Sequence, residues 1–177
     1  MTADRPAGTG GPAVVGDRDV AARLAGGDLP DVPLAVLQEG LRLPLHDYLG
    51  LVLAGLRPVV VEMPLTERTR TRAGPLHGGA LATLVDVAGN VAVATGGALD
   101  VTRYGLVTVR AEIDFRAQPD GEAVRATAEV LEVGRRTACS ECAVTDDAGR
   151  VVGRAVVTSR LVPHRGVAGT GLDGPRC

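Results

Sequence analysis

The pattern of apolar and polar positions along the chain predicts two kinds of element. Residues 77–95 form a long run rich in Ala, Leu and Val, without proline, in which apolar side chains cover most faces of a helix. A helix that is apolar nearly all round is usually buried. The pattern therefore predicts one central helix of about five turns over this stretch.

Segments on both sides of this helix alternate with a period of two, which is typical of strands. A β-branched strand is expected at 57–66, and a helical turn at 46–49 leads into an earlier strand. Strands are expected after the helix at 106–117, 122–134, 136–146 and 150–162. DDAG (146–149) and PDG (119–121) are the predicted hairpin turns, so these strands should form a meander. The sequence therefore predicts an α+β fold, with a curved antiparallel sheet wrapped round one long central helix.

Both ends of the chain are rich in Gly, Pro and Ala, which favours flexible segments. We expect an N-terminal extension at 1–33, containing a short helix at 17–26, and a C-terminal tail at 164–177. The length of 177 residues suits a single folded domain, which we place at 34–163.

Charge and composition exclude several classes of partner. The formal net charge is −2, from 19 basic and 21 acidic residues, which gives no electrostatic case for nucleic acid or an anionic membrane. Apolar runs are shorter than the roughly 20 residues of a membrane span, and no long apolar segment typical of a signal peptide precedes the domain. We therefore expect a soluble, cytoplasmic protein.

The cysteines and glycines predict no metal, disulfide or cofactor site. Cys139 and Cys142 form a CxxC within a predicted strand, where positions three apart point to opposite faces. Cys177 stands in the predicted tail. The chain has neither a Walker-type loop nor a dinucleotide-binding fingerprint nor a zinc-ligand cluster. Three histidines without a nucleophile-elbow motif make a Ser–His–Asp triad a poor interpretation.

The stretch GPLHGGALATLVDVAGN (74–90) concentrates the candidate chemistry. Asp86 is a carboxylate within an apolar helix, and a buried unpaired charge costs several kcal/mol, so it needs a partner or a catalytic role. Gly78 begins the helix, where backbone N–H groups are unpaired and the helix dipole is positive. Asn90 follows Asp86 by one turn on the same face. A purely structural carboxylate is the alternative interpretation.

This stretch, preceded by LGLVLAGLRPVVVEMPLT and followed by VTVRAEIDFRAQP, resembles the hotdog-fold acyl-CoA thioesterases, and among them the phenylacetate-degradation branch. The resemblance covers about residues 44–162. It implies the hotdog fold, dimers often paired into tetramers, and hydrolysis of an acyl-CoA to an acid and CoA. CoA would be part of the substrate, and no separate cofactor is implied.

The resemblance also implies roles for individual residues. Asp86 would act as nucleophile or general base, and the Gly78 N–H would polarise the thioester carbonyl. Asn90 and Thr108 would support the attacking water or the carboxylate. Thr71 stands where relatives commonly carry Asn or Gln, and its shorter side chain would donate one hydrogen bond to the carbonyl or water.

Further residues are expected to bind substrate. His77 and Gly79 lie at the start of the helix, although His77 could instead bond the loop backbone and Gly79 could permit close helix approach across a dimer, as could Gly89. In relatives, the region of Arg135 and Arg136 lies near the nucleotide end of CoA, whose phosphates suit arginine. A solvated hairpin end is the alternative for this pair.

The spacing of the two principal candidates indicates a homo-oligomer. Gly78 and Asp86 are eight residues apart, or roughly 12 Å along one helix, so a single thioester cannot contact both. If both act, Gly78 of one subunit must lie near Asp86 of another, across a two-fold axis. Two alternative functions stay open: hydrolysis of an acyl-carrier-protein substrate, and acyl-CoA binding without catalysis.

Overall fold

The computed structural model describes residues 34–164. The predicted extension at 1–33, the helix expected at 17–26, and residues 165–177 with Cys177 lie outside the described residues. The described part contains the helices α2 (Leu34–Gly40), α3 (Pro44–Leu49) and α4 (Gly78–Thr95). Its strands are β1 (Val52–Leu56), β2 (Val59–Pro64), β3 (Tyr104–Phe115), β4 (Ala123–Val133), β5 (Thr137–Asp146) and β6 (Val151–Pro163).

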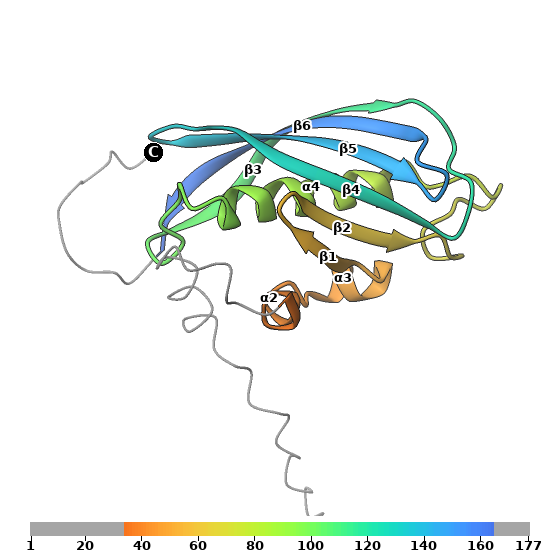
Figure 1. The fold of residues 1–177 in the computed structure, drawn as a ribbon, viewed down its shortest axis with the longest axis horizontal. Coiled ribbons are helices and arrows are strands. Elements are labelled where there is room, and N and C mark those ends of the chain that lie inside the picture. Colours follow the sequence, from red (N-terminus) through yellow and green to blue (C-terminus); the bar gives the residue numbers. More distant parts are fainter. Residues whose placement is uncertain (1–33, 165–177) are drawn as a thin grey trace, which may run out of the picture.

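Helix α4 is the core of the fold, as the sequence predicts. It begins at Gly78, one residue later than expected, and the antiparallel sheet curves over it (Figure 1). By length and composition α4 could cross a bilayer, although the sequence suggested that every apolar run was too short for this. Its 11 buried residues, among 18, nevertheless pack within the protein's own core. Burial in the core therefore accounts for its apolar character.

The strand order is β1-β2-β4-β5-β6-β3, so β4, β5 and β6 form the predicted meander, whereas the expectation that β3 precedes β4 in it is wrong. PDG at 119–121 does not close a hairpin, because β3 pairs with β6 and β4 pairs with β2. A turn sequence specifies that the chain reverses, but it does not specify which strand becomes the neighbour. The segment between β3 and β4 instead crosses the end of the sheet, and β3 becomes an edge strand. The DDAG turn does connect the paired strands β5 and β6, as predicted.

Two aspartates of that turn hold the crossing segment in place. Asp146 is buried and accepts hydrogen bonds from the backbone N–H of Asp120 and Arg150 and from the Arg150 guanidinium. Asp147 accepts from the backbone N–H of Glu122 at 2.7 Å and pairs with Arg125 at 2.8 Å. These contacts tie the β5–β6 turn to the chain that leaves β3.

The same contacts lower the pKa of both carboxyl groups. For Asp146, burial by itself raises the pKa, but the backbone hydrogen bonds from Asp120 and Arg150 and the Arg150 guanidinium together bring it below its usual range. For Asp147, the backbone N–H of Glu122 is the principal cause of a lowered pKa, followed by the Arg125 side chain. Both groups are therefore held in the charged form.

Small residues let α4 approach the sheet closely. A Cβ atom added at Gly89 would lie 2.6 Å from Ser140 Oγ and 3.1 Å from Val157 Cβ, so the glycine faces β5 and β6 of its own chain. This corrects the expectation that Gly89 serves a helix contact across a dimer. The hydroxyl of Ser140 is buried and has no hydrogen-bond partner within the described residues.

The two cysteines of β5 point to opposite faces, as expected from their spacing. Cys142 is buried and its Sγ lies 3.5 Å from the carbonyl of Val85 on α4, whereas Cys139 lies 3.4 Å from Thr158 Oγ1. Burial, with a smaller contribution from the charge of Asp86, raises the pKa of the Cys142 thiol to about 12. Cys142 is thus a core residue and a poor nucleophile.

Candidate active site

Asp86 is hydrogen-bonded and half-buried, not alone among apolar side chains. Its Oδ1 accepts a 2.5 Å hydrogen bond from Thr108 Oγ1 on β3 and a longer one, of 3.3 Å, from Asn90 Nδ2. Asn90 Nδ2 also donates to Thr108 Oγ1 at 2.9 Å. The structure therefore brings together three of the residues predicted from the sequence, and the carboxylate has partners within its own chain.

Sequence reasoning missed a fourth member of this cluster, Ser159 on β6. Its hydroxyl donates a 2.6 Å hydrogen bond to Asn90 Oδ1, and the residue is only 2% exposed. The contact joins positions 69 residues apart, so no local pattern points to it. The one available signal is a polar residue at an inward-facing position of a strand that otherwise buries apolar side chains.

A β-bulge aims Thr108 at Asp86. The register between β3 and β6 shifts between Thr108 and Arg110, which leaves Val109 as the extra residue. Thr108 is opposite Ser159 before the shift, and both hydroxyls face α4. Bulges reorient side chains and often occur beside functional sites.

The start of α4 has one free backbone donor. The His77 side chain is the N-cap, because its Nδ1 accepts a 2.9 Å hydrogen bond from the Gly79 N–H. Among residues 34–164, the N–H of Gly78 has no hydrogen-bond partner. A Cβ added at Gly78 would lie 3.4 Å from the ring of Phe115, at the end of β3. The structure thus gives His77 a structural role and leaves Gly78 able to bind an anion.

The two halves of this site are separated within one chain. Gly78 and Asp86 are eight residues apart on α4, or roughly 12 Å by helical rise. Thr71 lies near the Gly78 end, in a turn closed by its N–H bond to the Pro75 carbonyl at 2.7 Å. One chain therefore presents a hydrogen-bonded carboxylate and, about two helical turns away, an N–H donor that has no partner among the described residues.

Comparison with known proteins shows the family to which the chain belongs. Residues 73–153 match the thioesterase superfamily. The proofreading thioesterase EntH of Cronobacter sakazakii is 37% identical over 120 residues, which cover 65% of this chain and 80% of the relative. The chain belongs to the thioesterase superfamily. The corresponding EntH of Cronobacter turicensis is 36% identical over 122 residues, covering 66% of this chain and 82% of the relative.

Solved thioesterases share the fold. The crystal structure of a mutant thioesterase from Pseudomonas aeruginosa aligns with a TM-score of 0.69 and 24% identity, over 76% of this chain and 96% of the other. Zebrafish thioesterase superfamily member 2 aligns with a TM-score of 0.63 and 28% identity, over 75% of this chain and all of the other. The α+β hotdog fold and the activity of a thioester hydrolase, both predicted from the sequence, are confirmed.

The remaining predicted site residues of the thioesterase lie away from Asp86. Arg135 and Arg136 are exposed in the turn between β4 and β5, and neither forms an ion pair among the described residues. Gly79 is exposed, and a Cβ at that position would lie 3.1 Å from the His77 ring. A side chain at 79 would therefore disturb the helix cap.

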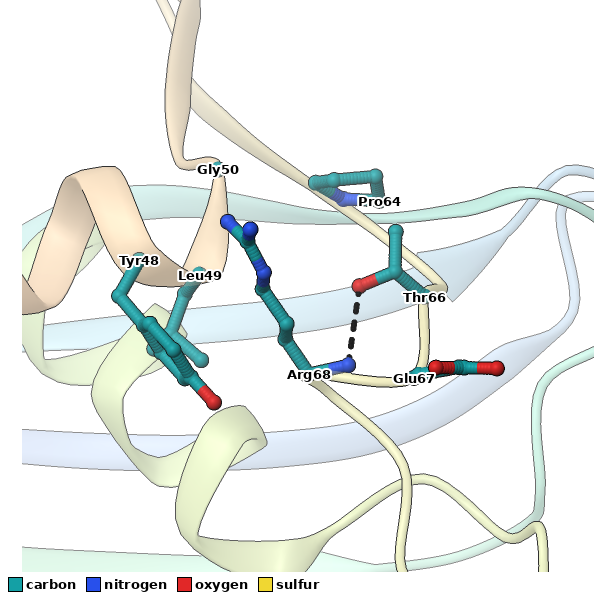
Figure 2. Close-up of a pocket in the computed structure, with 7 residues that line it drawn as sticks. All are labelled: Tyr48, Leu49, Gly50, Pro64, Thr66, Glu67 and Arg68. Atoms are coloured by element: carbon teal, nitrogen blue, oxygen red, sulfur yellow. Dashed lines mark hydrogen bonds between the residues drawn. The ribbon is translucent and has the colours of Figure 1, made fainter.

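A surface pocket of about 330 Å³ lies beside the loop that leads into α4. Figure 2 shows Arg68 directed between Gly50 and the ring of Tyr48, with its guanidinium carbon 5.3 Å from the ring centroid. Thr69, the next residue, accepts a hydrogen bond from the His77 N–H through its carbonyl. The pocket therefore adjoins the helix cap of the thioesterase, but no residue of the Asp86 cluster lines it.

Proposed function

We propose that this thioesterase hydrolyses acyl-CoA thioesters at two equivalent sites, each shared between two copies of the chain. Asp86 of one subunit supplies the carboxylate, and the Gly78 N–H of the other binds the carbonyl oxygen. The observation that carries the proposal is the separation, on one helix, of a carboxylate held by Thr108 and Asn90 from a free N–H at the helix start.

The chemistry follows from these two groups. A carboxylate with one oxygen held by hydrogen bonds can use its other oxygen to remove a proton from water, and the resulting hydroxide attacks the thioester carbon. Negative charge develops on the carbonyl oxygen and is stabilised by the Gly78 N–H and the positive end of the helix. When the C–S bond breaks, the proton passes to the CoA sulfur, and the acid leaves.

Direct attack by Asp86 on the thioester is the alternative route. It forms an anhydride and releases CoA, and water then hydrolyses the anhydride. Single-turnover hydrolysis in ¹⁸O-labelled water tests for the anhydride. Label in the Asp86 side chain demonstrates an anhydride that water opens at the Asp86 carbonyl, whereas label in the acid product alone is the result of activated water or of an anhydride opened at its acyl carbonyl.

The free edge of β3 supports a two-fold dimer. This strand has 12 residues and, within residues 34–164, no neighbour on its outer side, and it exposes the apolar side chains of Val107, Val109 and Phe115. A long apolar edge strand favours pairing with another strand. Pairing two copies antiparallel along β3 would also set their α4 helices antiparallel, with Gly78 of one opposite Asp86 of the other about a point near Ala82.

Recognition of CoA is proposed for Arg135 and Arg136, with His77, Gly79 and Thr71 contacting the thioester end. The arginines are exposed and free of carboxylate partners among the described residues, which suits binding of phosphate. We expect Arg135→Ala and Arg136→Ala to raise KM for acyl-CoA with little change in kcat. A pantetheine thioester without the nucleotide should show no such change.

The first test measures CoA released from acetyl-, octanoyl- and phenylacetyl-CoA by chromatography. Phenylacetyl-CoA is included because the sequence resembles the phenylacetate-degradation branch. Wild type should hydrolyse at least one of the three, and Asp86→Asn should lose the activity. Activity retained by Asp86→Asn would refute the proposed role of the carboxylate.

Gly78→Pro removes the backbone N–H donor and so tests its role in the reaction. Proline is well tolerated at the first position of a helix, and His77 already has the extended backbone that a residue before proline prefers, at φ −72° and ψ 125°. The fold should survive while kcat falls about 100-fold or more, the usual loss for one oxyanion donor. Gly78→Ala, which keeps the N–H, is the matched control and should lose much less.

Mixing the two inactive variants tests whether the site is shared. A heterodimer of Asp86→Asn and Gly78→Pro contains one site with an intact carboxylate and an intact N–H, and one site with neither. Activity should therefore appear on mixing and subunit exchange. If both groups acted within one chain, mixing would restore nothing.

A further inference from the structure

We propose that Ser159 is a positioning residue for the reaction, because it anchors a directed chain of hydrogen bonds that runs through Asn90 and Thr108 to Asp86. This inference rests on the proposed function of Asp86. Nothing in the sequence motif or in the resemblance assigns a role to Ser159.

The direction of each hydrogen bond follows from one contact. An Asn90 side-chain atom lies 2.9 Å from the backbone carbonyl of Asp86, which can only accept, so that atom must be the amide nitrogen. The other end of the amide is then the oxygen, which lies 2.6 Å from Ser159 Oγ. Ser159 must therefore donate its single proton to Asn90.

The directions of the remaining hydrogen bonds follow in the same way. Asn90 Nδ2 has two N–H groups, of which one is directed to the Asp86 carbonyl and the other to Thr108 Oγ1 at 2.9 Å. Because Thr108 accepts from Asn90, its own proton is free for Asp86 Oδ1, 2.5 Å away. Thr108 thus holds the carboxylate and has no further proton for the attacking water.

This arrangement differentiates the two carboxylate oxygens. Oδ1 receives the hydrogen bond from Thr108 and only a longer, shared contact of 3.3 Å from Asn90 Nδ2, whereas Oδ2 has no hydrogen-bond partner among residues 34–164. Oδ2 is therefore the oxygen that reacts. Loss of the Ser159 hydroxyl would leave Asn90 Oδ1 without a donor, so the amide and the bonds beyond it would lose their fixed orientation.

A second serine provides a matched control. Ser140 lies on the adjacent strand β5, is 1% exposed and faces the same helix, but its hydroxyl has no partner within the described residues. Ser159→Ala and Ser140→Ala thus remove the same atom from the same helix–sheet interface. Only the first change breaks the hydrogen-bond chain.

The kinetic test compares these two variants on the acyl-CoA that wild type hydrolyses fastest. Ser159→Ala should lower kcat about five- to tenfold with KM unchanged, as expected for loss of one positioning hydrogen bond. Ser140→Ala should match wild type. Equal kcat in the two variants would overturn the proposal.

A double-mutant cycle tests whether Ser159 acts through Asn90. Asn90→Ala should reduce kcat, and Ser159→Ala should add no further loss in that background, because the residue it positions is already gone. Additive losses would contradict the proposed chain and would indicate an unrelated structural effect.

Solvent exchange of the Asn90 side chain, measured without substrate, tests the hydrogen bond from Ser159 independently of the proposed function. The side-chain NH₂ signals of Asn90, assigned by their disappearance in Asn90→Ala, should exchange with solvent faster in Ser159→Ala and unchanged in Ser140→Ala. Unchanged exchange in Ser159→Ala would overturn the inference even if Asp86→Asn is inactive. Conversely, if Asp86→Asn remains fully active, the proposed function fails and Ser159 has no catalytic group to position, whatever the exchange rates.

Discussion

The Thr108 hydroxyl donates a 2.5 Å hydrogen bond to Asp86 Oδ1 and thereby joins the edge strand β3 to helix α4. The two residues are 22 positions apart, and β3 reaches Asp86 at this point through the bulge at Val109. The orientation of the carboxylate therefore depends on the strand that the proposed dimer would cover. Dimer formation and catalysis are consequently expected to be coupled.

Replacing Thr108 by Val tests this hydrogen bond. Valine has nearly the same shape but no hydroxyl, so Asp86 Oδ1 would keep only its 3.3 Å contact with Asn90. We expect kcat for acyl-CoA to fall about 10- to 100-fold, since the hydrogen bond is charge-assisted. Thr108→Ser keeps the hydroxyl and should retain most of the activity. Wild-type kcat in Thr108→Val would show that the bond is dispensable.

Gly89→Ala should destabilise the protein, because its new Cβ would lie 2.6 Å from Ser140 Oγ and 3.1 Å from Val157. Overpacking of a core by one methyl group costs about 1–3 kcal/mol in free energy of unfolding, which urea denaturation can measure. Ser140→Ala alone should be neutral or stabilising, because it removes a buried hydroxyl that has no partner in the described structure.

The double variant Gly89→Ala/Ser140→Ala tests directly whether the two positions contact each other. Removing the hydroxyl of Ser140 eliminates the closest contact of the new Cβ, so Ser140→Ala should recover part of the stability lost in Gly89→Ala. Strictly additive changes in the free energy of unfolding would mean that the two positions do not contact each other.

Much of the fold was predictable because each element carries its own periodicity. The apolar run over 77–95 and the alternating segments after it correspond closely to α4 and to β3 through β6. The position of β3 at the sheet edge was not predictable, because the turn at 119–121 is a local signal and pairing is a long-range result. Helix α2 was also missed, since its seven residues are too few to show a clear period.

The candidate site was predictable only where its residues share one helix. The spacing of Asp86 and Asn90 places them on one face, and the structure shows them hydrogen-bonded. Thr108 was predicted as a site residue only from the family resemblance, because a threonine in an alternating strand does not by itself indicate a function. Ser159 could not be found from sequence, since its position opposite Asn90 depends on how β6 packs on α4.

Val109→Lys should prevent the proposed dimer while leaving each chain folded. Val109 is 56% exposed on the free edge of β3, and a lysine there opposes strand pairing. Leu131→Lys is the matched control, because Leu131 is 54% exposed and is likewise the extra residue of a bulge, but on β4, away from the β3 edge of the sheet. Sedimentation analysis should find monomers for Val109→Lys only, and that variant should have lost thioesterase activity. A dimeric, active Val109→Lys would place the interface elsewhere.

The stability of the protein should fall in acid, and the turn aspartates should account for part of the loss. The pKa values of Asp146 and Asp147 are lowered in the folded state. For Asp146, burial raises the pKa, but hydrogen bonds from Asp120 and Arg150 outweigh this effect. For Asp147, the Glu122 N–H is the principal cause of the lowered pKa. A lowered pKa contributes stability that is fully present above the unfolded value, about 3.9 for Asp, and is lost as the pH falls through the folded value.

We therefore expect the free energy of unfolding, measured by urea denaturation between pH 2.5 and 7, to decrease below about pH 4. Asp147→Asn should be less stable than wild type at pH 7, and the difference should narrow in acid, because the protonated wild-type carboxyl no longer binds Arg125 as an ion. Asp146→Asn should lose more at pH 7, since it also leaves Arg150 without its buried carboxylate.

Asp114→Asn is the control for this series. Asp114 is exposed on β3, and its carboxylate accepts no backbone N–H bond within the described residues, only a 3.4 Å contact from Arg116. Its stability curve should parallel that of wild type at every pH. If Asp147→Asn also parallels wild type, the backbone hydrogen bonds at the β5–β6 turn contribute nothing to acid sensitivity, and carboxylates elsewhere in the fold must produce it.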